Sequence, residues 1–111
     1  MRRARSEELV LPVLIAGNKA SKEMRKREGI PPVDMLLLLY IRYNPRVYRF
    51  LDLAEGVGVC VETIRSSMQR MREHGDIEYG RGKVIKVTDS GKRLVRSYSA
   101  IYGNIIRGME V

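Results

Sequence analysis

The chain has 111 residues, enough for one domain of ordinary size, and 44% of them are hydrophobic, which is enough to form a packed core. Its formal net charge is +8, from 21 basic and 13 acidic side chains. Such an excess is typical of proteins with polyanionic partners, and it also occurs in proteins that use charge only for solubility. The positions of the cations in the chain must distinguish these two interpretations.

The same composition excludes several classes of protein. A single cysteine, Cys60, excludes an internal disulfide and a multi-cysteine zinc site, and we expect no metal and no cofactor. No apolar run approaches the roughly 20 residues that span a bilayer, so we expect a cytoplasmic protein with no membrane partner. No nucleophile and base are paired in the sequence, which argues against an enzyme.

Residues 1–32 are predicted to form a basic arm followed by a helix. Three apolar side chains share one face of this helix: Leu11, Leu14 and Ile15. Pro12 suits the first turn of a helix that begins near Leu11, whereas Ser6 and the two glutamates after it indicate an earlier start. Gly29 and the prolines that follow it should end the helix.

Residues 33–88 are predicted to form a winged helix-turn-helix unit. Val33–Tyr43 is apolar nearly all round and is expected to be the central core helix. Phe50–Gly56 is the first helix of the helix-turn-helix, and Val61–His74 is the second, ended by Gly75. A basic β-hairpin should follow directly.

In this hairpin, Asp76–Tyr79 and Lys83–Val87 are the expected strands. Gly80-Arg81-Gly82 joins them in a tight turn that uses glycine where φ is positive, with Arg81 at its tip. Arg46–Tyr48 is a candidate third strand.

The second helix of the helix-turn-helix is expected to contact DNA. Helical periodicity places Ile64, Met68 and Met71 inward, so the opposite face carries hydroxyls, an amide and guanidiniums that bond base edges and phosphates. The predicted DNA contacts on this helix are Thr63, Arg65, Ser66, Gln69 and Arg70. The hairpin adds Arg81, Lys83 and Lys86. Any solvated helix has a polar outer face, and the cations of the adjacent hairpin are what favour DNA here.

Residues 89–111 are predicted to form the last helix, capped by Thr88-Asp89-Ser90. Its apolar face is too wide for a free surface helix, which indicates either a cover for the monomer's own core or, as we favour, a dimer interface. The predicted dimerisation residues are Leu11, Leu14, Ile15, Tyr98, Ile101, Tyr102 and Ile105.

The strings LAEGVGVCVETIRSSMQRMREHGDIEY and KVIKVTDSGKRLV resemble winged-helix transcriptional regulators of the MarR-like group. The matching positions are Leu53-Ala54, Gly58-Val59, Thr63-Ile64, Met71, Gly75-Asp76-Ile77, Thr88 and Gly91. The resemblance implies a symmetric dimer, held by its N- and C-terminal helices, on a pseudo-palindromic operator. Cys60 departs from the group, which usually has Ser or Thr as the cap at this position.

The predicted fold is therefore mainly α with a small β-hairpin: a winged helix-turn-helix flanked by N- and C-terminal dimerisation helices. The predicted function is that of a homodimeric, sequence-specific regulator of transcription, a repressor, whose partner is double-stranded DNA. Two alternatives remain: a non-specific architectural chromatin protein, and a protein-interaction module of a transcription or replication assembly. Cys60 is either an oxidant-sensing thiol or, as we favour, a small half-buried residue.

Overall fold

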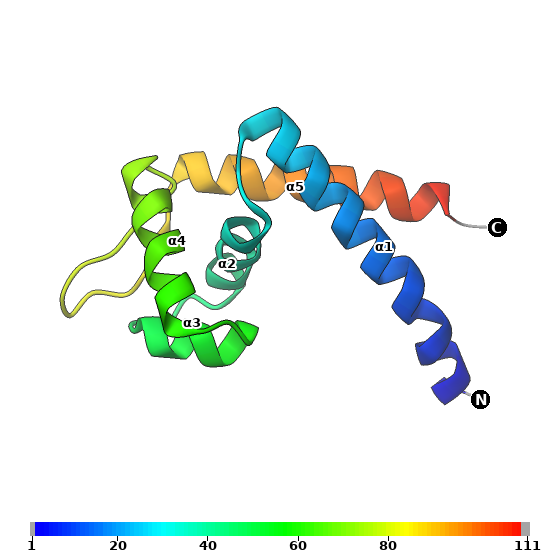
Figure 1. The fold of residues 1–111 in the computed structure, drawn as a ribbon, viewed down its shortest axis with the longest axis horizontal. Helices are drawn as coiled ribbons and strands as arrows, with labels where there is room; N and C mark the ends of the chain where they lie inside the picture. The colour runs from blue at the N-terminus through cyan, green and yellow to red at the C-terminus, as the bar shows by residue number, and fades with distance from the viewer. Residues whose placement is uncertain (1, 110–111) are drawn as a thin grey trace. The chain divides into compact units, whose positions relative to one another are not determined.

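The computed structural model describes the backbone of residues 2–109 and the side chains of residues 8–109. Met1, Glu110 and Val111, which belong to the predicted terminal segments, lie outside the described residues. Five helices and a two-stranded antiparallel sheet make up the described part, so the predicted mainly α fold with a small hairpin is confirmed (Figure 1). The chain divides into two compact units: the winged unit, Pro32–Val95, and the terminal unit, Met1–Pro31 with Arg96–Val111.

Three helices build most of the winged unit: α2 (Pro32–Tyr43), α3 (Phe50–Val57) and α4 (Val61–Glu73). All three were predicted to within two residues at each end. Their inward side chains form the centre of the core: Met35, Leu37, Leu38, Ile41, Leu53, Ile64, Met68 and Met71. Helix α2 supplies four of these core side chains, as expected of the central core helix, although its Leu36 is 43% exposed.

The wing is a short hairpin in which β1 (Ile77–Glu78) pairs with β2 (Lys86–Val87). Both strands are shorter than predicted, and the connection between them is correspondingly longer. At its tip the Lys83 amide donates to the Gly80 carbonyl at 3.1 Å, and Gly82 has the positive φ of 73° that this turn requires. Arg81 therefore occupies the tip of a tight turn, as predicted.

The predicted third strand over Arg46–Tyr48 is wrong. Only one main-chain hydrogen bond joins this segment to the hairpin, from the Ile85 amide to the Val47 carbonyl at 2.8 Å. The Val47 side chain is buried, so the segment is anchored in the core at this residue and does not continue as a strand.

The junction between the wing and α5 (Asp89–Gly108) is tightly packed. The Thr88 hydroxyl accepts a hydrogen bond from the Gly91 amide at 3.2 Å and donates one to the Gly75 carbonyl at 2.6 Å. Thr88 is thus the predicted cap of the last helix. A Cβ atom on Gly91 would collide with the Asp76 carbonyl, so only glycine lets α5 begin this close to the chain entering the wing.

The terminal unit contains α1 (Arg2–Glu28) and the part of α5 after Val95. A helix start near Leu11 is wrong: Pro12 lies inside α1, where it removes one of the many hydrogen bonds of a long helix. Gly29, with φ of 72°, ends α1 as predicted. Three residues form the buried side of α1: Ala16, Ala20 and Met24. Within the described residues, no helix combines the length and the apolar character needed to cross a bilayer.

Candidate nucleic-acid interface

Helix α4 has one buried side and one exposed side, divided as the periodicity predicts. Ile64, Met68 and Met71 are each at most 1% exposed. The opposite side presents four of the five predicted contact residues to solvent: Thr63, Arg65, Ser66 and Gln69. The Gln69 amide donates a weak hydrogen bond to the Glu73 carboxylate at 3.3 Å.

A tight turn places α4 after α3. Gly58, with φ of 74°, ends α3 by donating its amide to the Ala54 carbonyl at 2.9 Å. Cys60 stands at the N-cap of α4 but makes no side-chain capping bond. Its thiol instead lies 3.2 Å from the Thr63 hydroxyl, and this hydrogen bond lowers the pKa of the Cys60 thiol. Cys60 is exposed, so the favoured prediction of a half-buried residue is wrong.

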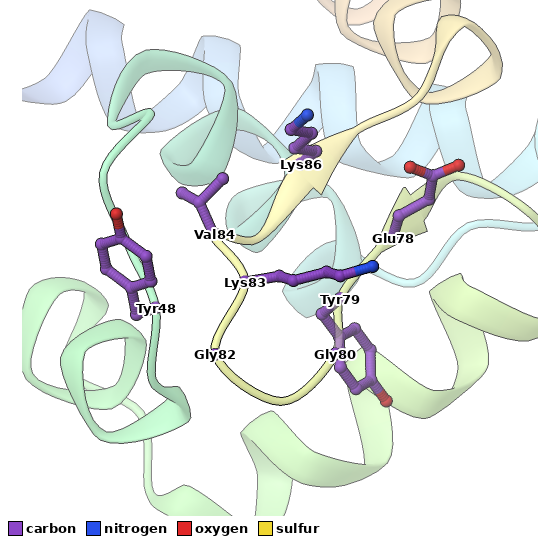
Figure 2. Close-up of a pocket in the computed structure, with 8 residues that line it drawn as sticks. All are labelled: Tyr48, Glu78, Tyr79, Gly80, Gly82, Lys83, Val84 and Lys86. Atoms are coloured by element: carbon purple, nitrogen blue, oxygen red, sulfur yellow. The ribbon is translucent and has the colours of Figure 1, made fainter.

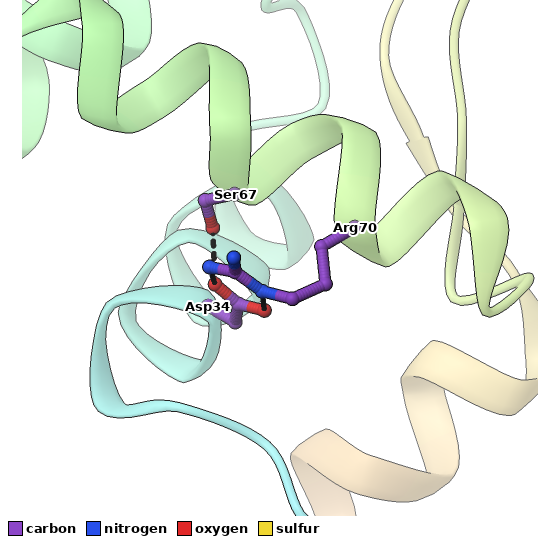
Figure 3. Close-up of polar contacts among 3 residues, drawn as sticks. All are labelled: Asp34, Ser67 and Arg70. Carbon is purple, nitrogen blue, oxygen red and sulfur yellow. Dashed lines mark hydrogen bonds and ion pairs between the residues drawn. The ribbon is translucent and has the colours of Figure 1, made fainter.

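The fifth predicted contact residue, Arg70, is arranged differently from the other four. Its guanidinium forms a two-point ion pair with Asp34 of α2, at 2.8 Å from Nε and 2.6 Å from Nη2 (Figure 3). The Ser67 hydroxyl donates to the same carboxylate at 2.5 Å. Asp34 is buried, and its hydrogen bonds raise the pKa of Arg70. The role of Arg70 as a DNA contact stays a prediction.

This cluster was missed by sequence reasoning. Neither Asp34 nor Ser67 was among the predicted site residues, and only apolar side chains were predicted to face inward on α4. Asp34 and Arg70 lie 36 positions apart, so no helical or strand spacing connects them. The one available signal was a charged residue at the start of an otherwise apolar helix, since a buried charge requires a partner.

The wing carries the three predicted cations, all exposed: Arg81, Lys83 and Lys86. An open hollow of about 600 Å³ lies beside them, with Tyr48 on one side and Tyr79 on the other (Figure 2). Figure 2 shows Lys83 extending across the loop toward the Tyr79 side, whereas Lys86 points away from the tip. Glu78 is directly opposite Lys86 in the strand register and offsets part of its charge. Positive charge is therefore concentrated toward the tip.

Tyr79 braces the base of the wing against the helices. Its ring meets Phe50 of α3 edge-on at 5.1 Å between centroids. The Arg72 guanidinium of α4 lies 4.7 Å from the centre of the same ring. This cation–π contact gives Arg72 a structural role at the base of the wing.

The predicted dimerisation residues lie in the terminal unit. Leu11 and Leu14 are 64% and 60% exposed, while Ile15 is half-buried. The four predicted residues of α5 are also half-buried: Tyr98, Ile101, Tyr102 and Ile105. Tyr98 and Tyr102 stack on each other at 6.1 Å. Three more exposed apolar residues surround Leu11 and Leu14: Leu9, Val10 and Val13.

Solved structures that this chain resembles include two transcriptional regulators and a MarR family protein. The transcriptional regulator Tm0710 from Thermotoga maritima matches with a TM-score of 0.73 at 18% identity, covering 96% of this chain and 76% of that one. MepR, a transcription regulator of the Staphylococcus aureus multidrug efflux pump MepA, matches with a TM-score of 0.76 at 17% identity, covering 94% and 80%. A MarR family protein from Bacillus stearothermophilus matches with a TM-score of 0.74 at 14% identity, covering 96% and 78%.

No protein-family model and no curated protein sequence matches the chain. The structural likeness, at these identities, establishes the fold. The chain has the winged-helix fold of MarR-type transcriptional regulators, as the resemblance in its sequence implied.

Proposed function

We propose that the chain is a homodimeric, sequence-specific regulator of transcription that binds double-stranded DNA and represses by occlusion. The observation that carries this proposal is the exposed side of α4, where hydroxyl, amide and guanidinium groups lie on one helical face. In a winged helix, this helix enters the major groove and the wing reaches the neighbouring backbone or minor groove. Arg81, at the tip of the wing turn, is the group best suited to a narrow minor groove.

The apolar surface of α1 supports a dimer. A single module of this kind buries only about 600–1,000 Å² on DNA, which limits its affinity. Two modules held together bind two half-sites about one helical turn apart, and their effective affinity multiplies. The exposed leucines of α1 and the half-buried residues of α5 supply apolar surface suitable for such pairing.

Selection of bound duplexes from a random pool is the direct test. The expected result is an inverted repeat whose half-sites are about 10 base pairs apart, because a twofold-symmetric dimer presents two copies of α4. A pool that stays random while affinity falls steeply with salt indicates instead an architectural protein. A chain that retains no duplex at physiological salt indicates a module for protein contact.

Substitutions then assign the contacts. Arg65→Ala and Gln69→Ala should each relax preference at one base position, by about 1–3 kcal/mol, because those side chains bond base edges. Arg81→Ala and Lys83→Ala should weaken binding to every sequence and lower the salt slope by about 1 each, because each wing cation, whether in the groove or on the backbone, adds positive charge close to the phosphates. Arg107→Ala, at the exposed end of α5, is the matched control and should leave base preference unchanged.

A further inference from the structure

We propose that the buried carboxylate of Asp34 fixes the rotation of α4, through Ser67 and Arg70, and so decides which side chains of α4 meet the DNA bases. Asp34 is then a positioning residue for base recognition. Arg70 contributes mainly by holding α4 to Asp34, and less by contacting DNA itself. This inference rests on the proposed function, because it concerns how selectively α4 recognises DNA.

The bonds to Asp34 are directional and well formed. Oδ1 accepts from Ser67 Oγ at 2.5 Å and from Arg70 Nη2 at 2.6 Å, and Oδ2 accepts from Arg70 Nε at 2.8 Å. Asp34 is 1% exposed, so water does not compete for its oxygens. Among the described side chains, no buried polar atom lacks a hydrogen-bond partner. A buried network with all its hydrogen bonds formed holds its side chains in one rigid arrangement.

The two donors sit where they control rotation. Ser67 and Arg70 are three residues apart on α4, on the side that faces α2 in Figure 3 and about 4.5 Å apart along the helix axis. Two attachment points at different heights oppose both rotation about the axis and sliding along it. The apolar contacts on the buried side of α4 are not directional, so they tolerate small rotations that these hydrogen bonds resist.

The predicted contacts Ser66 and Gln69 each directly precede one of these donors along the rigid helix. A rotation of α4 by about 20° would move an atom some 6 Å from the axis by about 2 Å. Hydrogen bonds to base edges need heavy-atom distances of about 2.7–3.2 Å, so a displacement of this size breaks them. Contacts to phosphates by flexible cations would survive it. Loss of the tether should therefore reduce selectivity for sequence more than general affinity.

Arg70 is oriented in agreement with this role. Its side chain is 39% exposed, yet its guanidinium is turned toward Asp34 and held at two points (Figure 3). If Arg70 were chiefly a direct DNA contact, removing the Asp34 charge would release it and would strengthen binding or leave it unchanged. The proposal instead predicts that removing the Asp34 charge lowers selectivity for the operator sequence.

The experiment compares affinities for the selected operator and for a scrambled duplex, in wild type and in three variants, each well below its melting temperature. Asp34→Asn should lower the ratio of the two affinities about tenfold, while affinity for the scrambled duplex changes little. Ser67→Ala removes one donor and should show a smaller loss. The double variant Asp34→Leu with Arg70→Met replaces the pair by apolar groups, which commonly restores stability but cannot restore the directional bonds. Its ratio should stay low.

Met71→Ala is the matched control, because it destabilises the same helix from its apolar side and should keep the ratio. Recovery of the ratio together with stability in the double variant would overturn the proposal, as would an unchanged ratio in Asp34→Asn. Residual dipolar couplings of α4 amides in the free protein supply a readout that needs no DNA. They should show a rotated α4 in the double variant, and an unrotated helix would also overturn the proposal. Equal binding of both duplexes by the wild type would instead refute the specific regulator.

Discussion

Helix α4 and the first half of α1 both expose a large surface, but of opposite character. The exposed side of α4 is polar and its apolar side is buried in the winged unit. In α1, five neighbouring apolar residues are between 47% and 64% exposed: Leu9, Val10, Leu11, Val13 and Leu14. At 100° per residue they spread over about 200° of the helix circumference. Nothing in the described part of this chain covers them.

The difference shows which partner each surface needs. A polar face is stable in water, so α4 can remain free and bind DNA only when a suitable duplex is present. Apolar surface costs about 25 cal/mol for each Å² left in water, so the leucines of α1 favour a permanent cover. We therefore expect DNA to be an exchangeable partner and a second copy of the chain to be a constant one.

The largest effect should come from breaking the apolar surface. Leu11→Asp combined with Leu14→Asp should give monomers in sedimentation equilibrium, because charged side chains cannot be buried without partners. Operator affinity should fall about 100-fold or more, since two half-sites are no longer linked. Leu36→Asp is the matched control, an exposed leucine of the winged unit, and it should remain dimeric. A monomeric wild type would contradict the expectation that a second copy of the chain covers the apolar surface of α1.

A second change tests how tightly the start of α5 packs against the wing inside the winged unit. Gly91→Ala should lower the free energy of unfolding by about 1–3 kcal/mol, because the added methyl group meets the Asp76 carbonyl and the Val87 side chain. Gly108→Ala has no neighbour within 4 Å and serves as control in the same urea titration. Equal stability of the two variants would mean that this junction can relax.

The smallest effect concerns the start of α4. The Thr63 hydrogen bond lowers the pKa of Cys60, so the thiolate forms at lower pH in the folded chain than in the denatured one. Any stability linked to this ionisation is present above the unfolded pKa and is lost as pH falls through the folded pKa. The rate of alkylation by iodoacetamide should accordingly rise at lower pH in the folded chain, and Thr63→Val should shift the profile upward. Coincident profiles for the two folded proteins would show that the hydroxyl has no such effect.

Much of the fold could be predicted because it depends on neighbours in the chain. Thr88 was predicted as a cap from its place before a helical pattern, and it bonds the Gly91 amide. The Gly80-Arg81-Gly82 turn was predicted to use glycine at a positive φ, and Gly82 has that conformation. The buried and exposed sides of α4 follow from a period of 3.6 residues. The lengths of the strands were overestimated. Only two residue pairs form the ladder, and the loop takes up most of the wing.

By itself, the sequence determined the order of the elements, the apolar inward faces of the helices, the cap of the last helix and the tip of the wing, since capping, turns and periodicity act over a few residues. Only the tertiary structure decided that Asp34 holds Ser67 and Arg70. It also decided that Tyr79 packs against Phe50 and Arg72. The exposure of Leu11 and Leu14 was decided in the same way. Each of these depends on which distant surfaces meet in space. Packing of the whole chain fixes that, and no local pattern records it.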